Sequence, residues 1–202
     1  MNQFTSFLCT LVLFLLVVPQ TMGFELPASW NYQAVPLFSI GLTRGGEDIL
    51  DGNDDSLGSQ VSAGGLLSIS SGIQFELPDM NLAVRGTVGI HADSLLSRIS
   101  SYSFDRKNVE LMVYSGWPRH RFGGGVTYHI NPTLKSRLYV NATSFQEAQF
   151  EDSLGFVAEY LFQPWHNVNF SLRQVFIDYK TGGQIRPIID GSHSGVGITY
   201  LF

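Results

Sequence analysis

Residue types that could carry out nucleophilic catalysis stand close together near the end of the chain, at Asp190, Ser192, His193 and Ser194. A serine hydroxyl that is activated by a histidine, itself oriented by a carboxylate, attacks ester and amide carbonyls. This chemistry needs the hydroxyl and the imidazole on one side of the backbone. Consecutive side chains of a strand point to opposite faces, so His193 would point away from Ser192 and Ser194. We therefore expect no catalytic residues here and no enzyme activity.

Charged residues at alternate positions of candidate strands form a second group. If those strands close around a narrow interior, the charges must pair, because an isolated buried charge is costly. We predict a lumenal charge network of the following residues: Arg85, Glu110, Glu159, Arg173 and His129. Such a network would plug the interior, with Glu159 placed diagonally to Arg173 on the adjacent strand. The alternative is a narrow small-solute channel, opened when the ion pairs exchange partners.

Eight segments in which apolar and small or polar residues alternate would position these side chains. They lie at about residues 37–44, 60–75, 82–91, 109–114, 121–130, 154–162, 168–179 and 194–202. In the seventh segment the apolar side changes after Gln174, which predicts a β-bulge there.

The connections between these segments alternate in length. Residues 45–59, 92–107, 131–149 and 181–191 form long loops, whereas 76–81, 117–120 and 163–167 form short turns that each contain a proline. Long loops at one end and tight turns at the other are typical of outer-membrane barrels, whereas a secreted Greek-key sandwich does not require them. The predicted fold is all-β: an eight-stranded, antiparallel, up-and-down transmembrane β-barrel.

The first 23 residues predict a cleaved signal peptide. The stretch from Phe7 to Val18 is apolar apart from Thr10, and a membrane-spanning helix needs about 20 such residues. The alternative is an uncleaved anchor. Cleavage after Gly23 would leave residues 24–202 as one barrel domain. The only cysteine, Cys9, lies before this cut, so the mature chain would contain no disulfide.

Aromatic and aliphatic residues mark the expected membrane boundary. A lower aromatic girdle beside the short turns would contain Trp117, Trp165, Phe75 and Phe162. The chain ends with alternating residues of one face, which are Val196, Ile198, Tyr200 and Phe202. This ending resembles the C-terminal signal by which the assembly machinery recognises bacterial outer-membrane barrels.

The whole mature chain resembles the small eight-stranded outer-membrane proteins, a group that includes the OmpA transmembrane domain, OmpX, and the OmpW-like and lipid A-modifying barrels. The resemblance implies a monomer in the outer membrane of a Gram-negative bacterium. Its implied partners are outer-membrane lipid and lipopolysaccharide, the barrel assembly machinery, and periplasmic chaperones in transit. Because some members modify lipid A, a lipid A acyl hydrolase or acyltransferase is the alternative function.

Other ligand classes are not supported by the sequence. A net charge of -5 with only 12 Lys and Arg residues gives no basic surface for nucleic acid. Asp51, Asn53 and Asp55 resemble the start of an EF-hand loop, but Ser56 and Ser62 replace its glycine and closing glutamate. We expect no metal site and no cofactor. The predicted role is structural or surface-interacting, through a polar plugged lumen and long extracellular loops.

Overall fold

Eight long strands form the wall of the molecule, as their alternating sequences predict. They are β1 (Gln33–Gly45), β4 (Leu67–Leu77), β5 (Leu82–Leu96), β6 (Ser100–Trp117), β7 (His120–Leu138), β9 (Ser153–Trp165), β10 (Val168–Phe176) and β13 (His193–Leu201). The computed structural model describes residues 32–51, 60–96, 100–117, 119–138, 144–181 and 188–202. The predicted signal peptide, much of the acidic first loop and Pro118 lie outside these residues.

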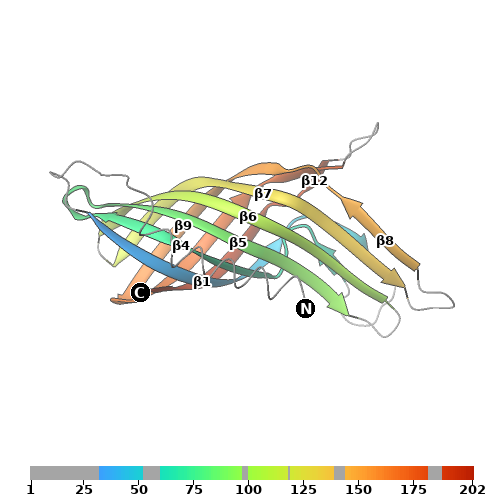
Figure 1. The fold of residues 1–202 in the computed structure, drawn as a ribbon, viewed down its shortest axis with the longest axis horizontal. Helices are drawn as coiled ribbons and strands as arrows, with labels where there is room; N and C mark the ends of the chain where they lie inside the picture. Colours follow the sequence, from blue (N-terminus) through green and yellow to red (C-terminus); the bar gives the residue numbers. More distant parts are fainter. Residues whose placement is uncertain (1–31, 52–59, 97–99, 118, 139–143, 182–187) are drawn as a thin grey trace, which may run out of the picture.

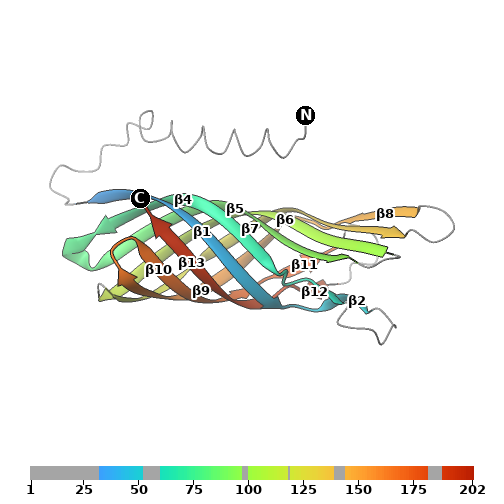
Figure 2. The same ribbon diagram turned by 90° about the horizontal axis from the view of Figure 1, so that it is seen from below.

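The strands close into an antiparallel barrel in the order β6-β5-β4-β1-β13-β10-β9-β7, with β7 paired to β6. The first and last strands meet over nine residue pairs, from Leu37 with Leu201 to Gly45 with His193. Figures 1 and 2 show the resulting elongated barrel, in which the strands run obliquely to the long axis. Closure leaves no unpaired edge within the wall, which a backbone in lipid requires. The predicted fold class is confirmed.

Short connections gather at one end of the barrel, which we call the turn end, and long connections at the other, the hairpin end. At the turn end, β4 and β5 are joined through the 3-10 helix η1 (Pro78–Met80). At the hairpin end lie four shorter strands, β2 (Asp48–Asp51), β3 (Gln60–Ser62), β11 (Asp178–Lys180) and β12 (Ile188–Asp190), which form two hairpins. Among the described residues, no helix is long and apolar enough to span a membrane.

Two segments that the sequence predicts as loops are largely strand. β5 and β6 stay paired out to Leu96 and Ser101, and β7 continues to Leu138, where it pairs with β8 (Ser144–Gln149). These strands extend past the others in Figures 1 and 2. The prediction was wrong because toward this end apolar residues such as Phe104 lie on the inner face, where the middle of the barrel is polar, so the hydrophobic alternation changes phase while backbone pairing continues.

The outer face of the barrel is an apolar band. Large apolar side chains point outward from every strand, such as Ile40, Leu111, Phe156 and Ile198, which are 47%, 53%, 64% and 52% exposed. The inward positions are polar in the middle of the barrel and apolar toward the hairpin end. This polarity is that of a membrane-spanning barrel, because lipid solvates the outside and the interior must satisfy its own polar groups.

The predicted bulge at Gln174 is wrong. Ser171, Val175, Ile177 and Tyr179 are all buried on the same face, so the alternation continues through this segment. The apolar residues change sides because the interior itself becomes apolar: Tyr179 packs there with Phe104 and Phe150. The register of β9 and β10 shifts instead beside the turn, between Val168 and Phe170.

The alternation of faces can be tested with two consecutive glycines of β7. A Cβ atom at Gly123 would lie 2.3 Å from the Tyr114 ring inside the barrel, whereas at Gly124 its nearest contact is at 3.9 Å. We expect Gly123→Leu to destabilise the barrel by about 1–3 kcal/mol or more through overpacking, and Gly124→Leu to fold normally. The folded fraction is read from the heat-dependent gel shift of the refolded protein. Equal folded fractions would contradict the assigned faces.

Candidate functional site

Two ion pairs cross the middle of the lumen. Arg85 on β5 places its Nη1 3.5 Å from Oε1 of Glu159 on β9, and Arg173 on β10 places its Nη2 2.7 Å from Oε1 of Glu110 on β6. Neither pair joins neighbouring strands. Each therefore ties together opposite parts of the wall, and the structure brings together four of the five residues of the predicted network.

The register explains which partners meet. Glu159 lies directly opposite Arg173 on the neighbouring strand, not diagonally to it as the sequence predicts. Nevertheless, each of these two side chains makes its ion pair with a residue across the lumen. The pairs that form depend on how the barrel closes, because closure decides which non-neighbouring strands face each other.

Further hydrogen bonds hold the two carboxylates. Oε1 of Glu110 also accepts hydrogen bonds from Oγ1 of Thr127 at 3.2 Å and Nδ2 of Asn108 at 3.1 Å. Oε1 of Glu159 accepts one from the Tyr114 hydroxyl at 3.3 Å. Charged groups that are buried with several donors around them are fixed in place, since a change of partner would leave a charge unsatisfied.

Arg85 is held from three sides. Its Nε donates to Oε1 of Gln74 at 2.8 Å, and its guanidinium lies 4.7 Å from the centre of the Tyr114 ring. The space that remains between the charged residues is only about 30 Å³. A buried water molecule needs about 10–15 Å³ of such cavity volume, so this space has room for about two water molecules.

A third ion pair lies toward the turn end. Nη1 of Arg121 is 2.7 Å from Oε2 and 2.8 Å from Oε1 of Glu76. Both side chains are partly exposed, at 19% and 18%. The charged layers thus continue from the middle of the lumen to its turn end.

A second buried polar cluster lies nearer the hairpin end and is centred on Arg106 of β6. Its Nη1 and Nη2 donate to the carbonyl oxygens of Ala63 at 2.8 Å and Gly64 at 2.7 Å, and Nη2 lies 2.9 Å from Nδ1 of His91. These contacts fasten the end of the first long connection over the interior. Nε2 of His91 in turn lies 2.7 Å from Oγ1 of Thr43.

Sequence reasoning missed Arg106 because it assigned residues 92–107 to a loop. The signal that could have found it is the inward set of β6, in which Phe104, Arg106, Asn108 and Glu110 follow at every second position. His129 lies with this second cluster and not with the ion pairs. Its Nδ1 is 2.6 Å from the Tyr179 hydroxyl, and the two rings are stacked.

The structure separates the candidate catalytic residues. The His193 side chain is buried in the interior, where Nδ1 donates to the carbonyl oxygen of Gly191 at 2.8 Å. Ser194 is exposed on the outer face and hydrogen-bonds to Oε1 of Gln174. Among the described residues, no serine hydroxyl is hydrogen-bonded to His193.

The other two candidates form a local turn contact. The backbone N–H of Ser192 donates to Oδ1 of Asp190 at 2.8 Å. Hydrogen bonds from Ser192 hold the pKa of the Asp190 carboxyl, which lies outside the barrel wall, below its usual value. Within the described part of the chain, no three His, Cys, Asp or Glu side chains are grouped as metal ligands would be.

The predicted aromatic girdle lies at the turn end. Its exposed members are Trp117 on β6, Trp165 on β9, Phe75 on β4 and Phe162 on β9. The residues of the predicted C-terminal signal all point outward at the end of β13, and the rings of Tyr200 and Phe202 are in contact.

Comparison with known proteins identifies the fold. No protein-family model and no curated protein matches the sequence. Among solved structures, the chain is similar to the attachment invasion locus protein Ail of Yersinia pestis, in complex with the heparin analogue sucrose octasulfate, with a TM-score of 0.51 and 12% identity. That similarity covers 84% of this chain and 97% of Ail.

Two further structures have lower scores. Neisserial surface protein A has a TM-score of 0.43 and 10% identity, covering 85% of this chain and 99% of that protein. The N-terminal β-barrel domain of Pseudomonas aeruginosa OprF has a TM-score of 0.39 and 12% identity, covering 85% and 100%. The chain therefore shares with Ail the fold of a small eight-stranded antiparallel β-barrel, and its apolar outer band is that expected of a barrel in lipid.

Proposed function

We propose that the protein is a non-enzymatic outer-membrane barrel with a plugged lumen and with long hairpins that face the cell exterior. Its role is structural or surface-interacting: it stabilises the envelope or presents the hairpins to partners. The observation that supports the plug most directly is the pair of ion pairs, Arg85 with Glu159 and Arg173 with Glu110, that cross the lumen. Together with neighbouring side chains they leave a cavity of only about 30 Å³ between them, which has room for about two water molecules.

The proposed topology follows from the direction of the strands. The short turns and the C-terminal Phe202 face the periplasm, and the hairpins β2–β3, β7–β8 and β11–β12 lie outside the cell. We also propose that a signal peptide is cleaved after Gly23. Periplasmic chaperones then carry the chain to the assembly machinery, which recognises the outward residues of β13. The closed wall and the paired charges support a monomer.

We expect the wild-type protein not to conduct ions through its lumen. A narrow channel would require Arg173 to leave Glu110, for example for the directly opposite Glu159, and breaking a buried pair costs about 3–5 kcal/mol. In planar bilayers we therefore expect no stepwise conductance from the purified, folded protein. Reproducible conductance steps that change in size in Glu110→Gln would support the channel and contradict the plug.

The ion pairs also predict a stability difference. Glu110→Gln leaves Arg173 buried without a full counter-charge and is expected to lower the free energy of unfolding by about 3 kcal/mol. The matched control is Asp105→Asn, because Asp105 and Lys135 form an ion pair at 3.9 Å in which both side chains are nearly half exposed. This control is expected to change stability by less than about 1 kcal/mol.

The free energies of unfolding of Glu110→Gln, Asp105→Asn and the wild type can be measured by urea unfolding in detergent micelles, followed by tryptophan fluorescence. A loss in Glu110→Gln no greater than that in Asp105→Asn would show that the lumenal pair is not a stabilising plug.

The alternative that the protein is a lipid A acyl hydrolase or acyltransferase can be tested by analysing lipid A itself. His193 and Ser194 lie on opposite sides of the barrel wall, so the chain lacks the contact on which acyl transfer or hydrolysis by this pair would depend. We expect lipid A from otherwise identical cells with and without the protein to have the same mass spectrum. A difference of one acyl chain would contradict the non-enzymatic proposal.

A further inference from the structure

A row of five outward positions crosses the wall of the barrel on five neighbouring strands. Each residue is the direct register partner of the next, in the order Gly124, Ala158, Gln174, Ser194 and Arg44. At the usual spacing between strands the row is roughly 19 Å long. Gly124 is only four residues from the start of β7 at the turn end, whereas Arg44 is the penultimate residue of β1 at the hairpin end. The row therefore rises obliquely from within the apolar band to its outer rim.

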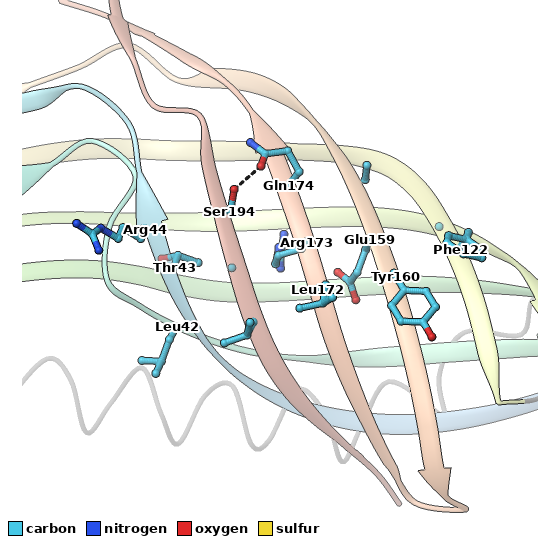
Figure 3. A pocket seen from close by; sticks show the side chains of 14 residues that line it. Leu42, Thr43, Arg44, Phe122, Glu159, Tyr160, Leu172, Arg173, Gln174 and Ser194 are labelled. Carbon is cyan, nitrogen blue, oxygen red and sulfur yellow. Dashed lines mark hydrogen bonds between the residues drawn. The ribbon is translucent and has the colours of Figure 1, made fainter.

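Larger side chains flank this row on both sides. On the side of the turn end stands a parallel row of register partners: Phe122, Tyr160, Leu172, Val196 and Leu42. On the other side, Val126, Phe156 and Phe176 are partners in the same way. A hollow of about 680 Å³ lies between the first of these flanking rows and Ala158, Gln174, Ser194 and Arg44, and Figure 3 shows the side chains that line it. Beside it, at Gly124, the register partner of Ala158, the surface is also open, because a Cβ atom there would meet nothing closer than 3.9 Å. We call the hollow together with this open surface at Gly124 the wall groove.

The chemistry along the wall groove changes from one end to the other. Its lower floor, at Gly124 and Ala158, is apolar. Its upper part is polar, but Gln174 is already satisfied there, since Oε1 accepts from Ser194 and Nε2 donates to the carbonyl oxygen of Val175 at 3.3 Å. Arg44 at the upper end is exposed, and among the described residues no acidic side chain pairs with it. Figure 3 shows Arg44 and Phe122 at opposite ends of the groove.

We propose that the wall groove is a binding site for lipid A, with an acyl chain on Gly124 and Ala158 and a phosphate at Arg44. The proposal rests on the outer-membrane location and topology described above. An acyl chain fits a lipid-facing floor without large side chains, and the guanidinium is the group that binds a phosphate with two parallel hydrogen bonds. In the proposed topology Arg44 lies at the level of the outer leaflet. Lipid A is the phosphorylated, acylated lipid of that leaflet in a Gram-negative outer membrane.

A second copy of the chain fits the same groove less well. None of the five residues of the row is acidic, so an identical face would offer no counter-charge to Arg44. A self-complementary interface at this position would bury the guanidinium against the row without a partner, which is costly. The polarity of the groove, apolar below and cationic above, matches a single lipid of the outer leaflet.

Lipid binding can be measured by native mass spectrometry of the folded mature protein in detergent, with added lipid A as the probe. The test variants are Arg44→Gln, which removes the cation, and Gly124→Leu, which fills the floor. Each has a matched control on the opposite wall: Lys107→Gln removes another exposed cation, and Gly86→Leu adds a side chain at an outward position where a Cβ atom meets nothing within 4 Å. Ala158→Leu fills the same floor by a second route if Gly124→Leu does not fold.

We expect each test variant to retain lipid A about fivefold less than the wild type, the effect of losing one modest contact, and both controls to retain it normally. Equal retention in all variants, or none in the wild type, would overturn the site. Equal retention of phosphatidylglycerol would overturn its assignment to lipid A. A dimer that Gly124→Leu dissociates would show an interface between copies instead. The heat-dependent gel shift separates these outcomes, since its absence in the wild type would contradict the barrel itself.

Discussion

The pairing of charges across a narrow lumen with little room for water is the constraint on which the rest of the structure depends. Arg85, Glu110, Glu159 and Arg173 come from four strands that are spread around the wall, and their two ion pairs are formed only when the barrel is closed in the observed register. A shift of one strand by a single residue would turn these charges toward lipid and apolar side chains inward. The cost of both changes favours a single register for the whole wall.

The wall has two chemically different faces because consecutive residues of a strand point in opposite directions. Gly123 faces the Tyr114 ring inside the barrel, whereas Gly124 leaves an open surface on the outer face beside Ala158. His193 is part of the interior, and its neighbour Ser194 contacts Gln174 on the lipid side. The alternation that brings the lumenal charges together therefore also separates the residue types of a catalytic triad. The proposed scaffold role and the separation of His193 from Ser194 have the same structural cause.

The sequence predicts the strands of the apolar band and their inward charges well, because both depend only on a period of two. It does not predict which charges pair: Arg173 meets Glu110 rather than the opposite Glu159 because partners across the lumen are chosen by closure, a property of all eight strands. Arg106 was missed, and a bulge was wrongly placed at Gln174, for one reason. Toward the hairpin end the inside becomes apolar and the outside polar, so hydrophobicity alone no longer reports which face is buried.

The most direct measurement of the central claim is a double-mutant cycle on the pair that crosses the lumen. The free energies of unfolding of Glu110→Gln, Arg173→Met and the double variant, compared with the wild type in the same micelles, give the coupling between the two side chains. If the pair closes and fixes the barrel, the coupling is about 2 kcal/mol or more and the double variant is more stable than Glu110→Gln alone. Additive losses, with coupling below about 0.5 kcal/mol, would contradict the account.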